Sequence, residues 1–565
     1  MATPLPLRRV LAAAAVPLVI APAAATAAPP PHPHPPHDGT IVEQRLTSGH
    51  RLDVYVPDDP LTGHRARSTP ILLVLPDTAV SADGARELAT SSGLADIART
   101  EHGVVAFLSP LGDAWTPSDT AAIPAALDRF DGFTGEPYDD EGQRCVPGGD
   151  GQQVCKFPGT DARVYLFGDR AGADFITEQL VGGIDTGDDR GTPWTPSAVY
   201  LSNPGPRTVA PDGDIEVPAY VVNGSRALEE SLERLNDRTH LFGTAKGPKG
   251  PGFHHAALRK GYDRVIEHAA RRWWTLPAQI YTLPDPKELG LRVEQDVLDV
   301  DGEPLEYLTY APRKQAGTVP LVMVFHGGSD NAEFMVWSTG WAQTAAEHGF
   351  MVVSVDQHVA RTPAQMVTLL DHLLAENPRI DASRVYASGF SMGSVKSFEL
   401  SEQFPDRFAA IAPMSGSFGP GPSEGERVPT IYFAGMRSTL PERPHQDGAP
   451  NDIDARVGDV LARNGVADDY AFDAAADPVW GIAADDQIHV ADDLFTDVSV
   501  TAKAYGSDDG HTYTVLAEAN SVSHESVPIE SEVGWAFLSQ FSRGADGEVV
   551  IEDGRFDLGK LDVSR

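Results

Sequence analysis

Residues 389–393 carry the pattern Gly-Phe-Ser-Met-Gly, in which Ser391 has the neighbours that a nucleophilic serine needs. The apolar run 384–388 before it predicts a short buried strand, and residues 394–403 after it predict a helix that ends before Pro405. A strand, a G-x-S-x-G turn and a helix together form a nucleophile elbow, because glycines tolerate the crowding beside the serine and the turn lifts its hydroxyl clear of the sheet. Ser391 is therefore the candidate nucleophile.

A serine hydroxyl attacks efficiently only when a neighbouring base accepts its proton. His524 is the candidate base, because it follows a strand predicted at 513–516 and precedes an amphipathic helix predicted around 533–538. The same imidazole would later protonate the leaving alcohol. The alternative interpretation is a buried turn serine and an unrelated surface histidine.

A His-Gly-Gly turn follows the apolar strand predicted at 320–325. Glycines leave backbone N–H groups bare, so that of Gly327 or Gly328, together with that of Met392, forms the expected oxyanion hole. The chain order of oxyanion turn, serine, acid and histidine is the α/β-hydrolase order, unlike the orders of the two well-known serine-protease classes.

The stretches 381–386 (DASRVY) and 404–416 (FPDRFAAIAPMSG), with the elbow between them, resemble the secreted polyhydroxybutyrate depolymerases and feruloyl esterases, a group of α/β-hydrolases. The resemblance extends over about residues 285–545. It implies an eight-stranded, mostly parallel sheet and hydrolysis of ester bonds through an acyl-enzyme, with no cofactor and no metal. Phe390 and Met392 depart from the group, which often has Cys or Leu before the serine and Ala after it. This departure bears on the substrate more than on the reaction.

A carboxylate must orient the base, and hydrolases usually carry it just after the strand predicted here at 430–434. Residues 435–438 contain no acid. Glu442 is the expected acid, since related secreted esterases have a similar Leu-Pro-Glu turn. Asp447 is the second choice, and the aspartates at 508–509 are further alternatives.

Residues 41–277 repeat the architecture of residues 285–545, so we expect two tandem α/β-hydrolase-like domains, each a mostly parallel sheet flanked by helices. The matched stretches are 69–77 with 319–327, 98–105 with 345–352, 161–165 with 381–386, 168–172 with 389–393, and 217–224 with 428–435. The alternative is that the apolar runs are simply those of any α/β chain.

The first copy has lost the residues that carry the chemistry. Arg170 stands where the nucleophile should be, and Pro76-Asp77 replaces the glycine pair with a carboxylate that would repel an oxyanion. A histidine survives at His254 or His255, near where His524 falls in the second copy. The first domain is therefore interpreted as a pseudo-hydrolase that serves packing, stability or polymer binding.

The N-terminal segment predicts export. Residues 1–28 have two arginines and then an apolar run too short to span a bilayer, as in a signal peptide, and residues 29–40 form a Pro/His linker. The sequence contains no later membrane-spanning run, and residues 546–565 are taken as a C-terminal tail. Cys145 and Cys155 are the only cysteines, and in an exported protein we expect them to form a local disulfide.

The chain has a net charge of −37, which argues against binding to nucleic acid or to an anionic membrane surface. Thirteen aspartates fall between Asp447 and Asp497, for which solvated surface is the expectation and a cation site the alternative. Trp337, Trp341 and Trp480 are candidates either for an acyl pocket or for core packing.

These observations predict a secreted serine esterase. Its substrate would be a polyester such as polyhydroxybutyrate, or a feruloyl or acetyl ester on a polysaccharide; the sequence does not separate these, and it leaves the oligomeric state open. The alternative is a non-catalytic exported binding or scaffold protein in which both hydrolase copies have drifted.

Overall fold

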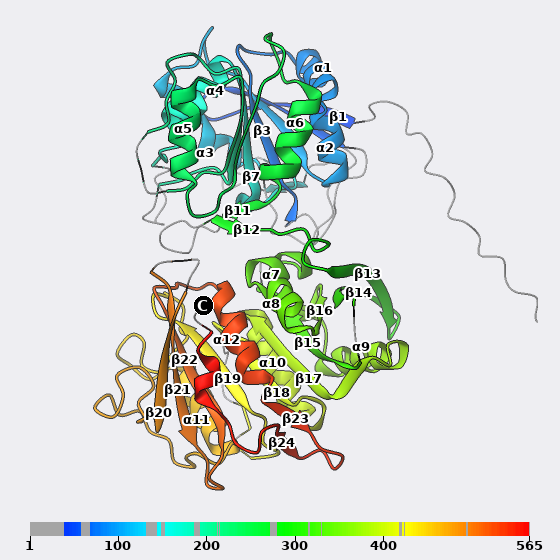
Figure 1. Cartoon of the computed structure of the whole chain (residues 1–565), viewed down its shortest axis with the longest axis vertical. Helices are drawn as coiled ribbons and strands as arrows, with labels where there is room; N and C mark the ends of the chain where they lie inside the picture. The colour runs from blue at the N-terminus through cyan, green and yellow to red at the C-terminus, as the bar shows by residue number, and fades with distance from the viewer. Residues whose placement is uncertain are drawn as a thin grey trace, which may run out of the picture. The chain divides into compact units, whose positions relative to one another are not determined.

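The central strands are short apolar runs buried on both faces, as in β3 (Ile71–Leu75) and β15 (Val319–Phe325). Strands of this kind belong to parallel sheets with helices on both sides. The computed structural model describes residues 39–563 except 58–67, 131–143, 148–152, 186–192, 212, 214, 272–279, 315–316, 329, 417–420, 423, 493–494 and 496. It contains two α/β domains, each built on one large sheet (Figure 1).

The first sheet has the strand order β1-β2-β4-β3-β7-β8-β9-β10. Its first two pairings, β1 with β2 and β2 with β4, are antiparallel, and the remaining pairings are parallel. Besides β3, its strands are β1 (Gly39–Arg45), β2 (Arg51–Pro57), β4 (Val104–Leu108), β7 (Val164–Asp169), β8 (Ala198–Ser202), β9 (Ala219–Val222) and β10 (Phe242–Ala245).

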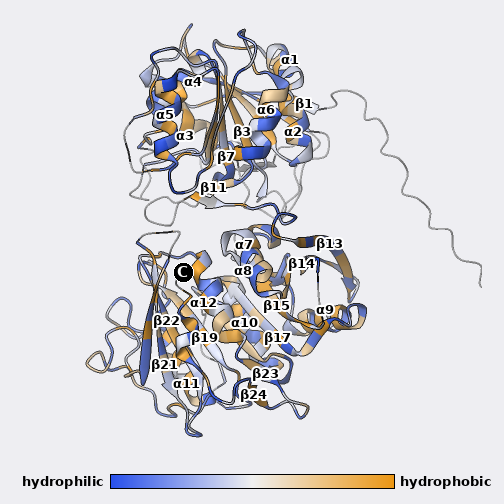
Figure 2. Ribbon diagram, in the orientation of Figure 1, coloured by the Kyte–Doolittle hydropathy of each residue, from blue (hydrophilic) through white to orange (hydrophobic). Residues whose placement is uncertain are grey.

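Helices cover both faces of this sheet because alternate strand residues point to opposite sides. One face packs against α1 (Ala82–Ser92), α2 (Leu94–Thr100) and α6 (His255–Gly261). The other packs against α3 (Ala122–Leu127), α4 (Ala171–Phe175) and α5 (Arg226–Leu235). The amphipathic character of α5 and α6 is visible in Figure 2, where hydrophobic and hydrophilic residues alternate along each helix.

The second sheet has the order β13-β14-β16-β15-β17-β18-β19-β22-β21-β20. The central run from β16 to β22 is parallel, and the pairings at both edges are antiparallel. Besides β15, its strands are β13 (Leu291–Val300), β14 (Glu303–Pro312), β16 (Met351–Val355), β17 (Ile380–Phe390), β18 (Ala410–Met414), β19 (Thr430–Gly435), β20 (Asp486–Ala491), β21 (Ser499–Gly506) and β22 (Thr512–Asn520).

The helices of the second domain repeat the arrangement of the first. One face packs against α7 (Ala332–Ser338), α8 (Trp341–His348) and α12 (Pro528–Leu538). The other packs against α9 (Pro363–Glu376), α10 (Met392–Gln403) and α11 (Asp452–Arg463). The expectation of two mostly parallel, helix-flanked sheets is confirmed.

The strand number expected for the second domain is wrong, since its sheet has ten strands rather than eight. The additional strands, β20 and β21, lie in and just after the aspartate-rich segment and pair antiparallel on β22. β20 is an edge strand that is largely exposed, so it lacks the apolar run by which the inner strands were predicted.

A two-stranded hairpin follows the last α-helix of each domain. β11 (Ala269–Arg271) pairs with β12 (Ile280–Thr282), and β23 (Phe541–Arg543) pairs with β24 (Val549–Ile551). The second strand of each hairpin lies beyond the domain ends placed at 277 and 545. Leu561, in the segment expected to be a tail, is fully buried in the core of the second domain.

A third hairpin, β5 (Arg144–Pro147) with β6 (Gln153–Lys156), sets Cys145 opposite Cys155 in register. The side chains of these cysteines lie outside the described residues, so the disulfide stays a prediction. Short 3₁₀ segments occur at Pro117–Ala121, Asp161–Arg163, His358–Ala360, Pro405–Arg407 and Leu558–Leu561, and π-helical turns at Ile176–Leu180 and Tyr262–Ile266.

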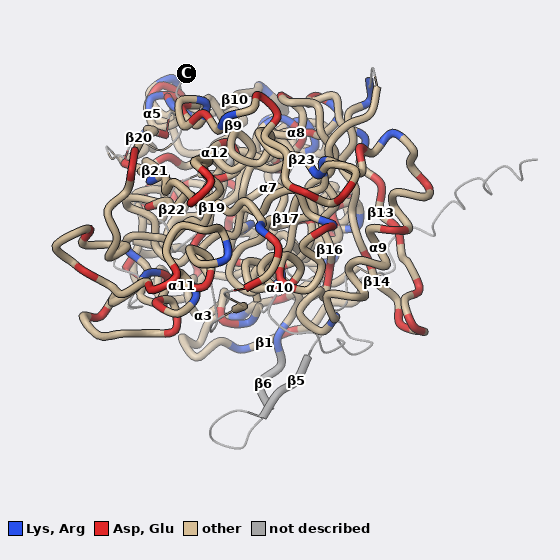
Figure 3. The backbone as a smooth tube through the Cα atoms, turned by 90° about the horizontal axis from the view of Figure 1, so that it is seen from below, with Lys and Arg blue, Asp and Glu red and all other residues tan. Residues whose placement is uncertain are grey.

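The predicted signal peptide and most of the linker also lie outside the described residues. Within the described ranges, no helix combines the length and the apolarity that a bilayer crossing requires. Acidic residues outnumber basic ones, 81 against 44, and Figure 3 shows them spread over many elements.

Candidate active site

Ser391 lies in a strained turn between β17 and α10, with φ 53° and ψ −111°. Its backbone N–H donates to Met414 O on β18 at 3.0 Å, which holds the turn on the sheet. A Cβ added at Gly393 would lie 1.9 Å from Phe325 O, and one at Gly389 would lie 2.4 Å from the backbone of Gly393. Only glycine fits at these two positions, so the elbow can form only with this spacing.

His524 reaches the serine from the loop between β22 and α12. Its Nε2 lies 2.9 Å from Ser391 Oγ. Ser415, which follows β18, donates its hydroxyl to Glu525 O at 3.1 Å and so ties down the next residue of the histidine loop. The ring of Phe390 packs beside the imidazole with 5.0 Å between ring centroids.

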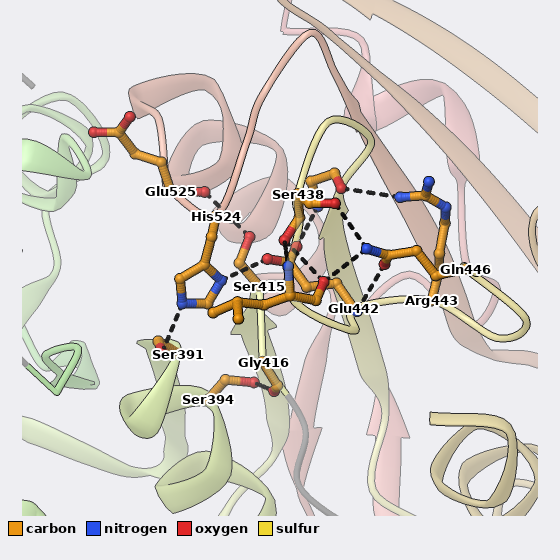
Figure 4. A network of polar contacts seen from close by, with 12 residues as sticks. Ser391, Ser394, Ser415, Gly416, Ser438, Glu442, Arg443, Gln446, His524 and Glu525 are labelled. Carbon is orange, nitrogen blue, oxygen red and sulfur yellow. Dashed lines mark hydrogen bonds and ion pairs between the residues drawn. The ribbon is translucent and has the colours of Figure 1, made fainter. Parts of the chain in front are cut away.

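Glu442 completes a contact chain with these two residues (Figure 4). Its Oε1 lies 2.6 Å from His524 Nδ1, and its Oε2 accepts from the N–H of Gly435 at 2.6 Å. The side chain is fully buried. Because an ionised carboxylate can only accept, the imidazole proton is assigned to Nδ1, which leaves Nε2 free to accept from the serine hydroxyl.

The other candidate acids lie elsewhere. Asp447 is exposed on the surface of the same loop. Asp508 and Asp509 pair with Arg427. Of the acids weighed from the sequence, Glu442 is the one that the structure places on His524.

The expected oxyanion donors lie around the elbow. Met392 is the first residue of α10, and within the described part of the chain we find no hydrogen bond to its N–H. A Cβ added at Gly328 would lie 3.4 Å from the Met392 side chain, and one at Gly327 would lie 2.7 Å from the Phe390 ring. The glycine turn therefore packs directly against the elbow, next to the positive end of the helix dipole.

The first domain keeps the shape of this elbow. Arg170 has φ 47° and ψ −108°, close to the values at Ser391, and its N–H donates to Ser202 O at 2.8 Å. A Cβ added at Gly172 would lie 1.9 Å from Leu75 O, the same clash as at Gly393. The two elbows therefore share one backbone conformation, although Arg170 stands where the second domain has its serine.

The chemistry of the first elbow is blocked by ion pairs and a capped donor. The N–H of Ala171, at the position of Met392, donates to Asp77 Oδ1 at 3.1 Å. The other oxygen of Asp77 pairs with Arg170 Nη2 at 3.0 Å, and Arg170 Nε lies 3.4 Å from Asp169 Oδ2. The Asp77 carboxylate thus occupies the donor that an oxyanion would need.

The surviving histidines do not lie where the second domain places His524. His254 is the exposed residue immediately before α6, and its side chain makes no capping hydrogen bond there. His255 Nε2 lies 3.8 Å from Asp96 Oδ2 on α2. Gly252 of this loop contacts the elbow through its N–H, which donates to Asp169 Oδ2 at 2.8 Å.

Two of the three candidate tryptophans are core residues. Trp341 is fully buried and lies edge-on to Phe350, and Trp480 is fully buried and lies edge-on to Tyr432. Trp337 is half-buried. In the residues that the structure describes, including most of the aspartate-rich segment, no group of three or more His, Cys, Asp or Glu side chains is arranged to hold a metal ion.

Comparison with known proteins relates the chain to ester hydrolases, although no family model matches it. It is 31% identical over 140 residues to a bifunctional acetylxylan esterase/xylanase from Neocallimastix patriciarum, covering 23% of this chain and 21% of that protein. It is 27% identical over 159 residues to poly(3-hydroxyalkanoate) depolymerase C from Paucimonas lemoignei, covering 25% of this chain and 37% of that protein. The matches thus span about a fifth and about a third of these relatives.

Among solved structures, an acetyl xylan esterase from Aspergillus awamori aligns with a TM-score of 0.32 and 14% identity, over 44% of this chain and 99% of that one. The sequence matches support the resemblance to polyhydroxybutyrate-depolymerase and feruloyl-esterase-like α/β-hydrolases that the motifs indicated.

Proposed function

We propose that this chain, an α/β-hydrolase similar to the esterases and depolymerases above, is a secreted serine hydrolase of carboxylic esters. The observation that supports this most directly is the contact chain from Glu442 through His524 to Ser391. Each contact has the geometry of a hydrogen bond, and the three residues stand in the order acid, base and nucleophile. The proposed catalytic domain spans 285–545 with its C-terminal extension, and residues 41–277 form a degenerate partner domain.

In the proposed mechanism, Ser391 Oγ attacks the ester carbonyl while His524 Nε2 accepts its proton. The N–H of Met392, with one from Gly327 or Gly328, stabilises the oxyanion, and one such donor contributes about 3 kcal/mol to transition-state stabilisation. His524 then protonates the leaving alcohol, which departs and leaves an acyl-serine. Water, deprotonated by the same imidazole, hydrolyses the acyl-enzyme and regenerates the serine.

The relatives suggest the class of substrate. One is named for acetyl groups on xylan and the other for a polyhydroxyalkanoate. We propose an ester carried by or forming an extracellular polymer. Assays on p-nitrophenyl esters of increasing chain length, methyl ferulate, acetylated xylan and a polyester film would identify it.

Labelling with a fluorophosphonate probe tests the proposed nucleophile. Only a serine activated by a base reacts with the probe, so we expect stoichiometric labelling and a single modified peptide that contains Ser391. A protein that stays unlabelled, or that is labelled on another serine, would favour the non-catalytic scaffold.

Restoring serine in the first domain is expected to leave that domain inactive. In Arg170→Ser the N–H of Ala171 would still be capped by Asp77, and no described histidine lies where it could accept the serine proton. The same probe and peptide mapping should therefore find label on Ser391 alone. A second labelled peptide carrying the new serine would show that the first elbow needed only its nucleophile.

A further inference from the structure

The proposed acid, Glu442, lies in a loop that leaves the end of β19 and returns to it. β19 ends at Gly435, and Glu442 follows seven residues later, yet its carboxylate returns to accept from the N–H of Gly435. The intervening loop must fold back on itself for this contact to form. Something in the loop has to hold that fold, because an unbraced turn of this length samples many conformations.

Gln446 makes three of the hydrogen bonds that close this loop, and Arg443 Nη1 adds another by donating to Gly435 O at 3.2 Å (Figure 4). Gln446 Oε1 accepts from the N–H of Glu442 at 3.0 Å. Its Nε2 donates to Ser438 O at 2.7 Å and to Leu440 O at 2.8 Å. The amide nitrogen of Gln446 therefore binds the backbone carbonyls of Ser438 and Leu440, and its amide oxygen binds the backbone N–H of Glu442.

The remaining polar groups of Glu442 are also held. Tyr432, on β19, donates its hydroxyl to Glu442 O at 2.8 Å. Burial raises the pKa of Tyr432 well above its ordinary value, so this hydroxyl remains a donor. The backbone of Glu442 is thus fixed at its N–H by Gln446 and at its carbonyl by Tyr432, while the carboxylate is fixed by Gly435 and His524.

We propose that Gln446 is a positioning residue for catalysis, which keeps the Glu442 carboxylate on His524 by closing the loop that carries it. The proposal rests on the proposed function, in which Glu442 orients the base. It predicts that Gln446 acts on turnover only through Glu442. A residue that acted on turnover by another route would lower kcat by the same factor with and without Glu442.

The test is a double-mutant cycle. Gln446→Met keeps the side-chain volume but removes all three hydrogen bonds, and it is expected to lower kcat by about tenfold to a hundredfold with KM unchanged. Glu442→Gln is expected to lower kcat by about 10³- to 10⁴-fold. In the double variant, Gln446→Met should change kcat by less than about twofold relative to Glu442→Gln alone.

The controls separate this role from misfolding. Asp447→Asn changes the exposed neighbour of Gln446 and should leave kcat and KM as in the wild type. Rates are expressed per mole of folded protein, with the folded fraction of each variant measured by circular dichroism and thermal melting, so unfolded protein does not count. Gln446→Glu keeps the acceptor for the Glu442 N–H but sets an oxygen against two carbonyls, and it should lose turnover as well.

A proton spectrum supplies a readout independent of rate. The proton on His524 Nδ1, 2.6 Å from Glu442 Oε1, is expected to resonate far downfield and to be assigned by its loss in Glu442→Gln. In Gln446→Met this signal should shift or broaden. The proposal is overturned if Gln446→Met turns over like the wild type. It is equally overturned if the substitution lowers kcat by the same factor with and without Glu442. Failure of the proposed function itself would appear separately, as activity retained by Ser391→Ala.

Discussion

Replacing Ser391 by alanine is expected to lower kcat for ester hydrolysis by about 10⁵- to 10⁶-fold, because no other atom at the elbow can form the acyl-enzyme. The fold should persist. The serine is largely buried, but the described contact of its hydroxyl is with His524 alone, and the strained backbone is held by the N–H to Met414. Hydrolysis of a p-nitrophenyl ester and the melting temperature, measured on the same preparation, provide the test.

Ser397→Ala is the matched control for this prediction. Ser397 lies on α10, and its hydroxyl donates to Gly393 O within the helix at 3.0 Å. Its loss should cost some stability and leave the chemistry in place. Activity in Ser391→Ala within an order of magnitude of the wild type would end the assignment of the nucleophile.

Replacing His524 by alanine is expected to cost about as much as losing the serine, because the two side chains act as one unit. The imidazole takes the proton of the nucleophile and also delivers it to the leaving group, so its loss slows both acylation and the departure of the alcohol. The double variant Ser391→Ala/His524→Ala should be no slower than either single variant by more than a few-fold. The measurement is kcat/KM of all three variants on one substrate.

A double variant slower by the product of the two single effects would mean that Ser391 and His524 act independently, which the 2.9 Å contact between them argues against. His489→Ala is a suitable control for histidine removal, since His489 lies exposed on the edge strand β20, outside the proposed site. It should leave kcat/KM unchanged.

The acid is the residue on which sequence reasoning left the choice open, and Glu442 and Asp447 are only five positions apart in one loop. The strand end carries no acid at Ser438, and the sequence favours Glu442 over Asp447 only through the resemblance of its Leu-Pro-Glu turn to that of related esterases. The choice is made by Gln446 and Tyr432, which fold the loop so that Glu442 turns inward and Asp447 stays at the surface. The contact of Gln446 forms only in the closed loop, and the contact of Tyr432 forms only when that loop packs against β19.

The edge strand β20 was missed, and the histidines of the first domain were placed wrongly, for related reasons. β20 has little apolar character, so only its pairing with β21 reveals it as a strand. The histidine at His254 or His255 matched His524 by its place along the chain. In space, however, the loop after β10 presents Gly252 to the elbow, and His255 lies against α2.

The sequence by itself determined the features whose causes are local. Glycines at 389 and 393 are required by clashes within a few residues and with the adjacent strand, and buried strands need unbroken apolar runs. The elbow, the two sheets and the presence of Arg170 rather than serine in the first domain were therefore all readable from residue order. Only the tertiary structure decided which acid meets His524, how many strands complete the second sheet, and that Asp77 caps the first elbow. Those outcomes depend on side chains brought together from separate loops, and such distances are set by packing and by hydrogen bonds rather than by spacing along the chain.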